Sequence, residues 1–302
     1  AHNTTLYIDD FKQNDPKFIY FFLQKLNLQS YSGGSAVPTL NRNHIHPITI
    51  NLPPLPEQKA IAKILGDLDD KIELNRKMNQ TLEEMAQALF KSWFVDFDPV
   101  LDNALAAGNE IPDELQVLAK KRSLVSEDKK LLNVNPELAE GFPNRFVFNE
   151  ELGKWIPEGW EIVKFNEIVE VKYGKDHKKL EEGKYPCFGS GGVMRYVEST
   201  LFDDESVLIP RKGTLSNLML VREPFWSVDT MFFTKFKKKN YAKFIFYFLQ
   251  KFNFTEMNVG SAVPSMTTSV LNNIDLLQPS VETLNLFEEE AERLLSRKES
   301  NT

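Results

Sequence analysis

The sequence has 302 residues, 42% of them hydrophobic, and a formal net charge of −7. This length predicts about two domains with sizeable cores, and the acidic balance argues at first against a nucleic-acid partner. The single cysteine, Cys187, excludes a disulfide framework and fits a reducing cytoplasm. No stretch approaches the roughly 20 apolar residues that cross a bilayer, which excludes a membrane-spanning helix.

Charge is unevenly distributed along the chain. Residues 151–280 carry 17 Lys and Arg against 16 Asp and Glu, a net of +1, so the remaining residues carry −8. Within this near-neutral part, lysines cluster at 172–179 and at 235–239. Such a patch could contact phosphates, but it is modest, and we expect binding to need help from another subunit.

Three elements are predicted before residue 53. The alternation of β-branched and aromatic residues over 1–12 predicts a strand. The Asp-Pro pair at 15–16 predicts a helix over roughly 16–28, because proline favours the first helical turn. After a glycine pair at 33–34, a second strand is predicted through Ile45, Ile48, Ile50 and Leu52.

One passage occurs twice, 226 positions apart and without an insertion. Residues 18–25 return as 244–251, the segment Gly-Ser-Ala-Val-Pro at 34–38 returns letter for letter at 260–264, and 2–7 match the pattern of 228–233. A period of this size indicates two domain-sized copies of one unit, suited to two equivalent docking tasks. The first copy would then be only a tail, and the chain is expected to be truncated at its N-terminus.

A long helix is predicted after the proline-rich segment 53–56. Apolar or amide residues recur every four and three positions, which is a heptad seam through about 38 residues or roughly 57 Å of helix. A coiled-coil rod is favoured over an amphipathic core helix, and the seam asparagines would fix its register. The seam residues are Ile61, Leu65, Leu68, Ile72, Asn75, Asn79, Leu82, Ala86, Leu89 and Trp93.

The rest of the chain predicts a second folded unit. Residues 98–150 are acidic and lack sustained periodicity, so an irregular linker with one short helix at 113–122 is expected. Short strands begin near Leu152, with buried strands at 207–210 and 225–228, and an aromatic helix at 244–251 matches the one at residue 18. A helix after Pro279 is the counterpart of the rod, so it could cover only part of it. The exposed remainder is expected to contact another chain.

Catalytic motifs are not found. The sequence has no G-x-x-x-x-G-K-[ST] phosphate loop and no methyltransferase signature, and its four histidines with one cysteine give no zinc spacing. Asp176 with Glu182 and Lys184 imitates a metal-nuclease triplet, but such triplets arise readily where Lys and Glu are frequent. Cys187 has no evident base partner, which favours a buried structural thiol. We therefore expect a chain without catalysis of its own.

Several segments together resemble a known family, the specificity subunit of type I restriction-modification enzymes. The segments that resemble its central spacer are 34–38, 52–58, 61–62, 70–72 and 91–100, with the sequences GSAVP, LPPLPEQ, IA, DKI and KSWFVDFDPV. The segments that resemble one of its target recognition domains are 152–160, 188–192, 209–214, 225–226 and 229–230. These segments cover nearly the whole chain in the expected order.

The resemblance implies an α+β protein in which mixed α/β target recognition domains are joined by long helices that form an antiparallel coiled-coil spacer. It also implies a non-catalytic, cytoplasmic subunit that reads a bipartite double-stranded DNA target. Modification subunits would dock along the spacer and methylate adenine with S-adenosylmethionine, and restriction subunits would add ATP and Mg²⁺ chemistry. The expected divisions are a first recognition-domain remnant (1–52), spacer helix (53–97), linker (98–150), second recognition domain (151–279) and shortened second helix (280–302).

Three loops of the second unit are the candidates for DNA contact, because base reading needs side chains at base edges and phosphate contacts need Lys, Arg or backbone amides. Arg211 could donate to guanine and Asn217 to adenine. A solvated lysine loop and a purely structural glycine turn are the alternatives. The candidates are Lys172, Lys175, His177, Lys178, Lys179, Ser190, Gly191, Gly192, Arg211, Lys212, Gly213, Thr214, Ser216 and Asn217.

Other functions remain open at this point. The chain could be a coiled-coil assembly adaptor that has lost DNA binding, or a half-subunit that recognises DNA only after it pairs with another copy through the exposed spacer helix. A nuclease activity of the chain itself would require metal-dependent nicking. The sequence does not reveal the target bases, because recognition depends on loop geometry.

Overall fold

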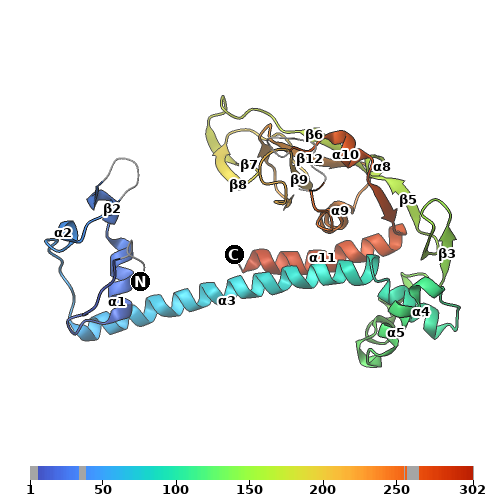
Figure 1. Ribbon diagram of the computed structural model, residues 1–302, viewed down its shortest axis with the longest axis horizontal. Helices are drawn as coiled ribbons and strands as arrows, with labels where there is room; N and C mark the ends of the chain where they lie inside the picture. The colour runs from blue at the N-terminus through green and yellow to red at the C-terminus, as the bar shows by residue number, and fades with distance from the viewer. Residues whose placement is uncertain (1–5, 34–38, 255, 257–264, 302) are drawn as a thin grey trace. The chain divides into compact units, whose positions relative to one another are not determined.

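The computed structural model describes residues 6–33, 39–254, 256 and 265–301. Contacts divide the chain into two units. The first unit comprises Ala1–Gln80 and Asn301–Thr302, and the second comprises Thr81–Ser300. The division falls within the longest helix, α3 (Leu55–Phe94), which runs through 40 residues without a break (Figure 1). The repeated segment at 34–38, its second copy at 260–264 and the start of the predicted first strand lie outside the described residues.

The first unit is built on α1 (Pro16–Lys25), as the Asp-Pro pair predicts. Asp15 caps this helix by accepting a hydrogen bond from the Phe18 amide at 2.9 Å. Gln58 of α3 is 2% exposed, accepts from the Asp15 amide at 2.9 Å and donates to Asn14 at 2.8 Å. The start of α1 is therefore tied to α3. The other elements are η1 (Leu28–Tyr31), the antiparallel strands β1 (Ser32–Gly33) and β2 (Thr39–Leu40), and α2 (Arg42–Ile45).

The two strands predicted before residue 53 are wrong in the described residues. Residues 6–12 form no strand, and α2 followed by irregular backbone occupies 42–52. At the 226-residue offset the counterparts of these segments are the strands β12 (Met231–Phe236) and β13 (Asp275–Gln278), which pair with β6, β9 and β5. The first unit offers no such partner among its described residues. The isoleucines instead line an apolar pocket of about 250 Å³ beside α1.

The second unit holds most of the regular structure. Its helices are α4 (Asp98–Ala106), η2 (Asp113–Leu115), α5 (Gln116–Ser123), η3 (Glu127–Lys129), α6 (Leu131–Val134), α7 (Pro136–Glu140), α8 (Phe165–Ile168), α9 (Ala242–Leu249), α10 (Thr268–Asn272) and α11 (Val281–Ser300). Its remaining strands are β3 (Phe146–Asn149), β4 (Lys154–Pro157), β5 (Glu161–Lys164), β6 (Val169–Tyr173), β7 (Glu182–Gly189), β8 (Gly192–Val197), β9 (Ser206–Pro210), β10 (Met219–Val221) and β11 (Trp226–Ser227).

Two sheets position the candidate residues. The larger one has the order β10-β9-β12-β6 and is antiparallel throughout. The second has the order β11-β7-β8, in which β11 runs parallel to β7. β9 is buried along its whole length, as expected for the predicted strand at 207–210. The hairpin β3–β4 and the pair β13–β5 complete the strands that the structure describes.

The repeat in the sequence is also a repeat of helices. α1 and α9 begin at Pro16 and Ala242, α2 and α10 at Arg42 and Thr268, and α3 and α11 at Leu55 and Val281. Each pair of starting residues is 226 positions apart. The helix starts therefore recur in both units at the period of the sequence repeat, whether or not the strands form.

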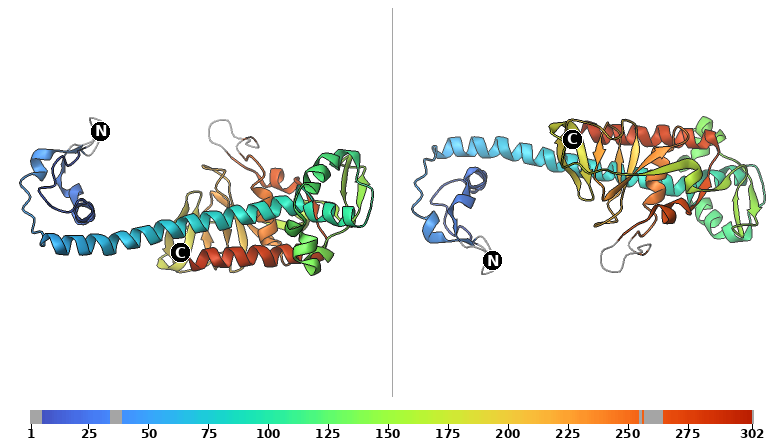
Figure 2. Two further views of the ribbon diagram at one scale, coloured as in Figure 1. Left: turned by 90° about the horizontal axis from the view of Figure 1, so that it is seen from below. Right: turned by 90° about the horizontal axis from the view of Figure 1, so that it is seen from above.

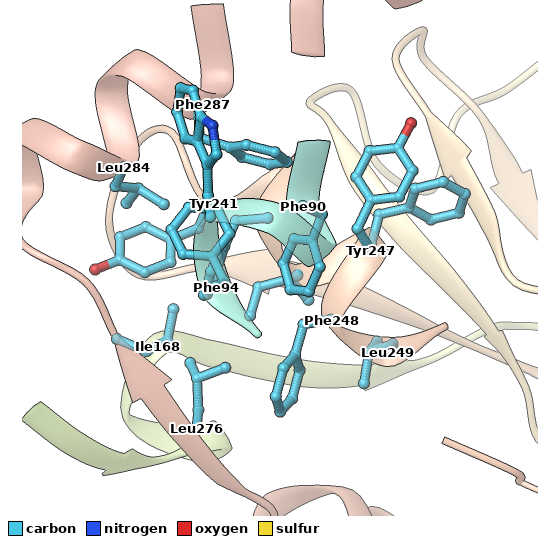
Figure 3. Packing of buried hydrophobic residues seen from close by; sticks show 14 of the residues in the cluster. Phe90, Phe94, Ile168, Tyr241, Tyr247, Phe248, Leu249, Leu276, Leu284 and Phe287 are labelled. Atoms are coloured by element: carbon cyan, nitrogen blue, oxygen red, sulfur yellow. The ribbon is translucent and has the colours of Figure 1, made fainter. Parts of the chain in front are cut away.

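A cluster of aromatic side chains joins three helices of the second unit. The ring of Phe287 on α11 lies 5.8 Å from Phe90 and 5.0 Å from Phe94, both on α3, and 6.5 Å from Phe244 on α9. Figure 3 shows Phe90, Phe94 and Phe287 among the buried side chains of this cluster, together with Tyr247 of α9. α11 runs beside the second half of α3 in both views of Figure 2. The two are antiparallel, because Phe287 contacts Phe90 while Lys298 donates to Glu83 at 2.8 Å.

Buried charges fix α9 against α11. The Glu288 carboxylate accepts hydrogen bonds from the backbone amides of Lys243 and Phe244 at 3.0 and 3.1 Å, where it caps the start of α9. The Lys243 ammonium, with its side chain 6% exposed, lies 3.1–3.2 Å from carboxylates of three residues. Burial disfavours this charge, but the surrounding carboxylates outweigh burial and raise the pKa of Lys243. The three carboxylates belong to Glu205, Glu288 and Glu292.

Residues 98–150 differ from the predicted irregular linker. They hold α4 to α7 rather than one short helix, and they pack on the end of α3. Asp102, with its side chain 1% exposed, receives two hydrogen bonds from Arg122 at 2.9 and 2.6 Å. This bidentate pair joins α4 to α5. Such short helices depend on tertiary contacts, which explains why no sustained periodicity marks them.

No helix in the described part of the chain is both long and apolar enough to cross a membrane.

We expect Phe287→Ala to lower the free energy of unfolding of the second unit by about 3–5 kcal/mol, because it removes a fully buried ring of α11 that contacts α3 and α9. Urea unfolding followed by circular dichroism measures the change. Val281→Ala on the same helix is the control, since Val281 is 63% exposed and its truncation should cost less than about 0.5 kcal/mol. Equal losses in the two variants would contradict the assigned role of the cluster.

Stability is expected to fall at alkaline pH because burial raises the pKa of Tyr247, with the nearby Glu83 charge acting in the same direction. The unfolded chain ionises its tyrosines near pH 10, while the folded state resists this ionisation. The contribution is therefore complete below about pH 10 and is lost as the pH rises toward the folded-state pKa. In Tyr247→Phe the melting temperature should fall less between pH 9 and 11 than in the unsubstituted chain. Tyr196→Phe, at an exposed position, should leave this fall unchanged.

Candidate functional site

The candidate DNA-contact residues lie in the second unit, on loops that follow β6, β7 and β9. β6 and β9 flank β12 and run antiparallel to it, with Tyr173 and Ile209 both opposite Phe232. Their carboxyl ends therefore meet at one end of the larger sheet, beside the start of β12 (Figure 1). The loop after β7 lies at the same end of the sheet. β11 pairs with β7, and the chain continues from β11 directly into β12.

Arg211 directly follows β9 and is half-buried. Its amide donates to the carbonyl of Thr230 at 2.9 Å, which continues the pairing of β9 with β12. The Arg211 side chain donates through Nη1 to the carbonyl of Asp229 at 3.0 Å. The guanidinium carbon lies 5.3 Å from the centre of the Tyr173 ring. Arg211 is therefore held at this end of the sheet by both its backbone and its side chain.

The loop 211–217 packs on the turn between β7 and β8. Asn217 donates through Nδ2 to the carbonyl of Ser190 at 2.8 Å. Gly213 has φ of +86°, and a Cβ atom there would lie 3.1 Å from the Ser190 hydroxyl. The Met266 amide donates to the Arg211 carbonyl at 2.9 Å and supports the loop from the other side. Two of the three predicted loops are therefore in direct contact.

The lysine loop is held to the same framework. The amide of Gly174 donates to Met231 at 3.0 Å, and that of Lys175 donates to Ser227 at 2.9 Å. The indole of Trp226 donates to the Lys175 carbonyl at 3.0 Å. A Cβ at Gly174 would lie only 2.0 Å from the Val228 carbonyl oxygen, so glycine is required for this close approach. The loop is anchored at its start rather than loosely attached.

The candidate side chains differ in availability. Lys172 forms an ion pair with Glu170 at 2.6 Å on its own strand, and Asn217 is engaged by the Ser190 carbonyl. His177 is half-buried, and within the described structure its Nδ1 has no hydrogen-bond partner. The exposed candidates are Lys175, Lys178, Lys179, Gly191, Lys212, Gly213, Thr214 and Ser216, and the half-buried ones include Ser190 and Gly192. Direct contact of any of them with DNA stays a prediction.

Sequence reasoning left out the aromatic residues of this region. Tyr173 and Trp226 each hold a predicted loop in place, through the Arg211 guanidinium and the Lys175 carbonyl. One signal was present, since Tyr173 stands between two lysines of the predicted cluster. The contact with Arg211, 38 positions further along the chain, follows only from the strand register.

Cys187 and the possible metal ligands are the remaining groups that bear on catalysis. Cys187 is buried, as predicted, and burial raises the pKa of its thiol against the opposing charge of Arg195. Among the residues that the structure describes, no three His, Cys, Asp or Glu side chains are grouped to hold a metal ion.

The seam of α3 is covered along only one of its halves. Leu82, Ala86 and Trp93 are at most 6% exposed, and Leu89 is partly buried. In the first unit, Ile61, Leu68 and Ile72 are 38%, 53% and 49% exposed, and Leu65 is partly buried. The seam asparagines bond to Asn301, which accepts from Asn75 at 2.8 Å and donates to Asn79 at 3.1 Å. An apolar stripe is thus left open on the first half of α3.

Comparison with known families and proteins identifies similar chains. The type I restriction modification DNA specificity domain family matches residues 2–84 and 157–286. The specificity subunit of type I restriction enzyme HindI from Haemophilus influenzae is 24% identical over 95% of this chain and 72% of its own length. The MjaIX specificity subunit from Methanocaldococcus jannaschii is 24% identical over 90% of this chain, which spans only 60% of that relative.

A solved structure shares the fold. The type I restriction-modification system S subunit from M. genitalium superimposes with a TM-score of 0.56 at 18% identity, over 94% of this chain and 67% of that one. This likeness supports the α+β fold class, with small sheets and long helices, that the sequence predicts.

Gly213→Ala should destabilise the second unit by about 1–3 kcal/mol, because a side chain at φ of +86° is strained and its Cβ would press on Ser190. Gly191→Ala is the matched control in the adjoining turn. A Cβ there meets no atom within 4 Å and the residue has no positive φ. Thermal unfolding of the two variants provides the measurement, and a larger loss for Gly191→Ala would refute the packing described for this loop.

Proposed function

The chain belongs to the family of type I restriction-modification DNA specificity domains, and we propose that its residues 151–279 recognise one half of a bipartite duplex DNA target. In this proposal the chain is a non-catalytic specificity subunit, and other subunits perform the chemistry. The convergence of three predicted loops at one end of the larger sheet carries the proposal. Contacts of Arg211, Ser190 and Lys175 with neighbouring strands and loops support it.

The loops divide into two kinds of contact. The exposed lysines Lys175, Lys178, Lys179 and Lys212 suit phosphate oxygens, which give affinity and salt dependence without reading the sequence. Arg211 suits base reading, because a guanidinium donates in a fixed fork to the two acceptors of guanine in the major groove. Asn217 remains a candidate for adenine only if it can keep its bond to Ser190.

The helices supply a spacer and a docking surface in this proposal. The proposed divisions are a first recognition-domain segment (1–52), spacer helix (53–97), linker (98–150), second recognition domain (151–279) and second helix (280–302). Modification subunits that methylate adenine with S-adenosylmethionine would dock along α3, and restriction subunits with ATP and Mg²⁺ would join them. The apolar stripe on the first half of α3 supports a further helical contact.

A second candidate function rests on the same stripe. Leu68 and Ile72 are 53% and 49% exposed on α3, as expected for a helix that packs against a partner helix. The chain could then be an assembly adaptor, or a half-subunit that recognises DNA only after it pairs with another copy. An adaptor would confer no sequence preference on the complex, which separates it from the recognition proposal.

The test uses the full chain in complex with its modification subunit. Duplexes selected from a randomised pool define the preferred sequence, and binding is then measured on single base-pair variants. Arg211→Ala should cost about 1–3 kcal/mol on the selected duplex and relax the preference at one base pair. Lys212→Ala, one position away, should weaken binding to all duplexes alike and reduce the salt slope by about 1.

Three outcomes would count against the proposal. A complex that selects no sequence from the pool would favour the adaptor. Uniform weakening by Arg211→Ala across all duplexes would assign Arg211 to a phosphate rather than a base. Metal-dependent nicking by the purified chain would show that the subunit is catalytic.

A further inference from the structure

We propose that Tyr173 is a positioning residue for base reading, and that its ring holds the Arg211 guanidinium so that one edge of the guanidinium is presented to a base pair. This inference rests on the proposed function, because it names a residue that would determine specificity within the same recognition domain. Tyr173 was not among the residues predicted to contact DNA. Its role follows from where the two strands end.

The Tyr173 ring is itself held in place. Tyr173 is the last residue of β6 and lies opposite Phe232 of β12. The two rings meet edge to face, with centres 5.0 Å apart and planes at 71°, which is a favourable geometry for aromatic pairs. Phe232 is fully buried. The exposed Tyr173 ring therefore rests on a side chain that belongs to the core.

The strand register brings Arg211 to this ring. Phe232 pairs with Tyr173 on one side and with Ile209 on the other. Arg211 is two positions beyond Ile209, and alternate residues of an extended chain face the same side of a sheet. Tyr173, Phe232 and Arg211 therefore share one face of the sheet at its end, and the guanidinium carbon lies 5.3 Å from the ring centre.

In the part of the chain that the structure describes, the contacts of Arg211 leave one edge of its guanidinium open. Nη1 donates to the carbonyl of Asp229 at 3.0 Å, and the Tyr173 ring contacts the guanidinium. Within the described residues, no protein atom accepts a hydrogen bond from Nε or Nη2 of Arg211. These two groups form the kind of parallel pair of donors that guanine O6 and N7 accept.

Fixing the guanidinium in advance should favour selective binding. A free arginine loses side-chain entropy when it binds, whereas one held by a ring and a carbonyl has lost much of that freedom already. Because the ring contributes no hydrogen bond to a base in this arrangement, its removal should reduce discrimination only through Arg211. An exposed cation–π contact corresponds to about a two- to fivefold effect on binding.

The experiment compares three variants of the full chain in complex with the modification subunit. The probes are the duplex selected from a randomised pool and its single base-pair variants. Tyr173→Leu removes the ring and should relax the preference about two- to fivefold at the base pair that Arg211→Ala relaxes. Tyr173→Phe keeps the ring and should retain the preference. Tyr196→Leu is the control, since Tyr196 is 53% exposed on β8 and Tyr173 is 51% exposed.

A double substitution separates positioning from direct contact. If Tyr173 acts through Arg211, Tyr173→Leu should cause no further loss of preference in the Arg211→Ala background. In the Arg211→Lys background, Tyr173→Leu should likewise cause no further loss of base-pair preference, because a lysine lacks the planar fork. Additive losses, equal weakening on every duplex, or the same relaxation in Tyr196→Leu would overturn the inference. Circular dichroism melting of each variant accompanies the binding data, and Tyr173→Phe and Arg211→Lys preserve the test if Tyr173→Leu unfolds.

Failure of this inference can be distinguished from failure of the proposed function. If the unsubstituted complex selects no sequence, the recognition function itself fails. If it selects a sequence and Arg211→Ala relaxes one base pair while Tyr173→Leu does not, recognition stands and only the role of Tyr173 is lost.

Discussion

The packing of Phe287 against the rings of α3 and α9 is the interaction on which the second unit depends. Phe90 and Phe94 bring the end of α3 to this point, and Phe244 brings α9. α9 in turn contacts β9 and β10 of the larger sheet. The direction of the sheet, and hence of the loops at its end, is therefore set by side chains on helices. Hydrophobic burial of this size is worth several kcal/mol for each ring.

The same arrangement explains how a near-neutral domain could read DNA. The basic residues are few, so each has to be placed accurately rather than contribute to a broad positive field. Backbone hydrogen bonds from Gly174, Lys175 and Arg211 to the segment 227–231 provide that accuracy. In the proposed function the packed helices and strands supply rigidity and the loops supply the contacts, which is the usual division in proteins that recognise a ligand with loops.

Local patterns in the sequence predicted α1, α3, α9 and α11, but not the short helices of 98–150, and the strands predicted before residue 53 were wrong. The heptad seam and the Asp-Pro pair are local signals, and they placed α3 and α1 correctly. A strand needs a partner, and β13 forms because β5 lies beside it, whereas the matching segment near Ile50 has none in the described residues. The contact between the Arg211 guanidinium and the Tyr173 ring could not be predicted from the sequence either, because it depends on strand register across β12.

β9 has a different kind of contact at each end. Just before it, Glu205 joins the ion pairs of Lys243 and Arg222 that fix the sheet to α11, and just after it Arg211 enters the candidate loops. Five buried residues separate the two. The exposed residues 212–214 lie beyond these five, so substitutions there leave the ion pairs of Glu205 in place. A scaffold built in this way keeps the exposed residues that can vary apart from the charges that hold its sheet to its helices.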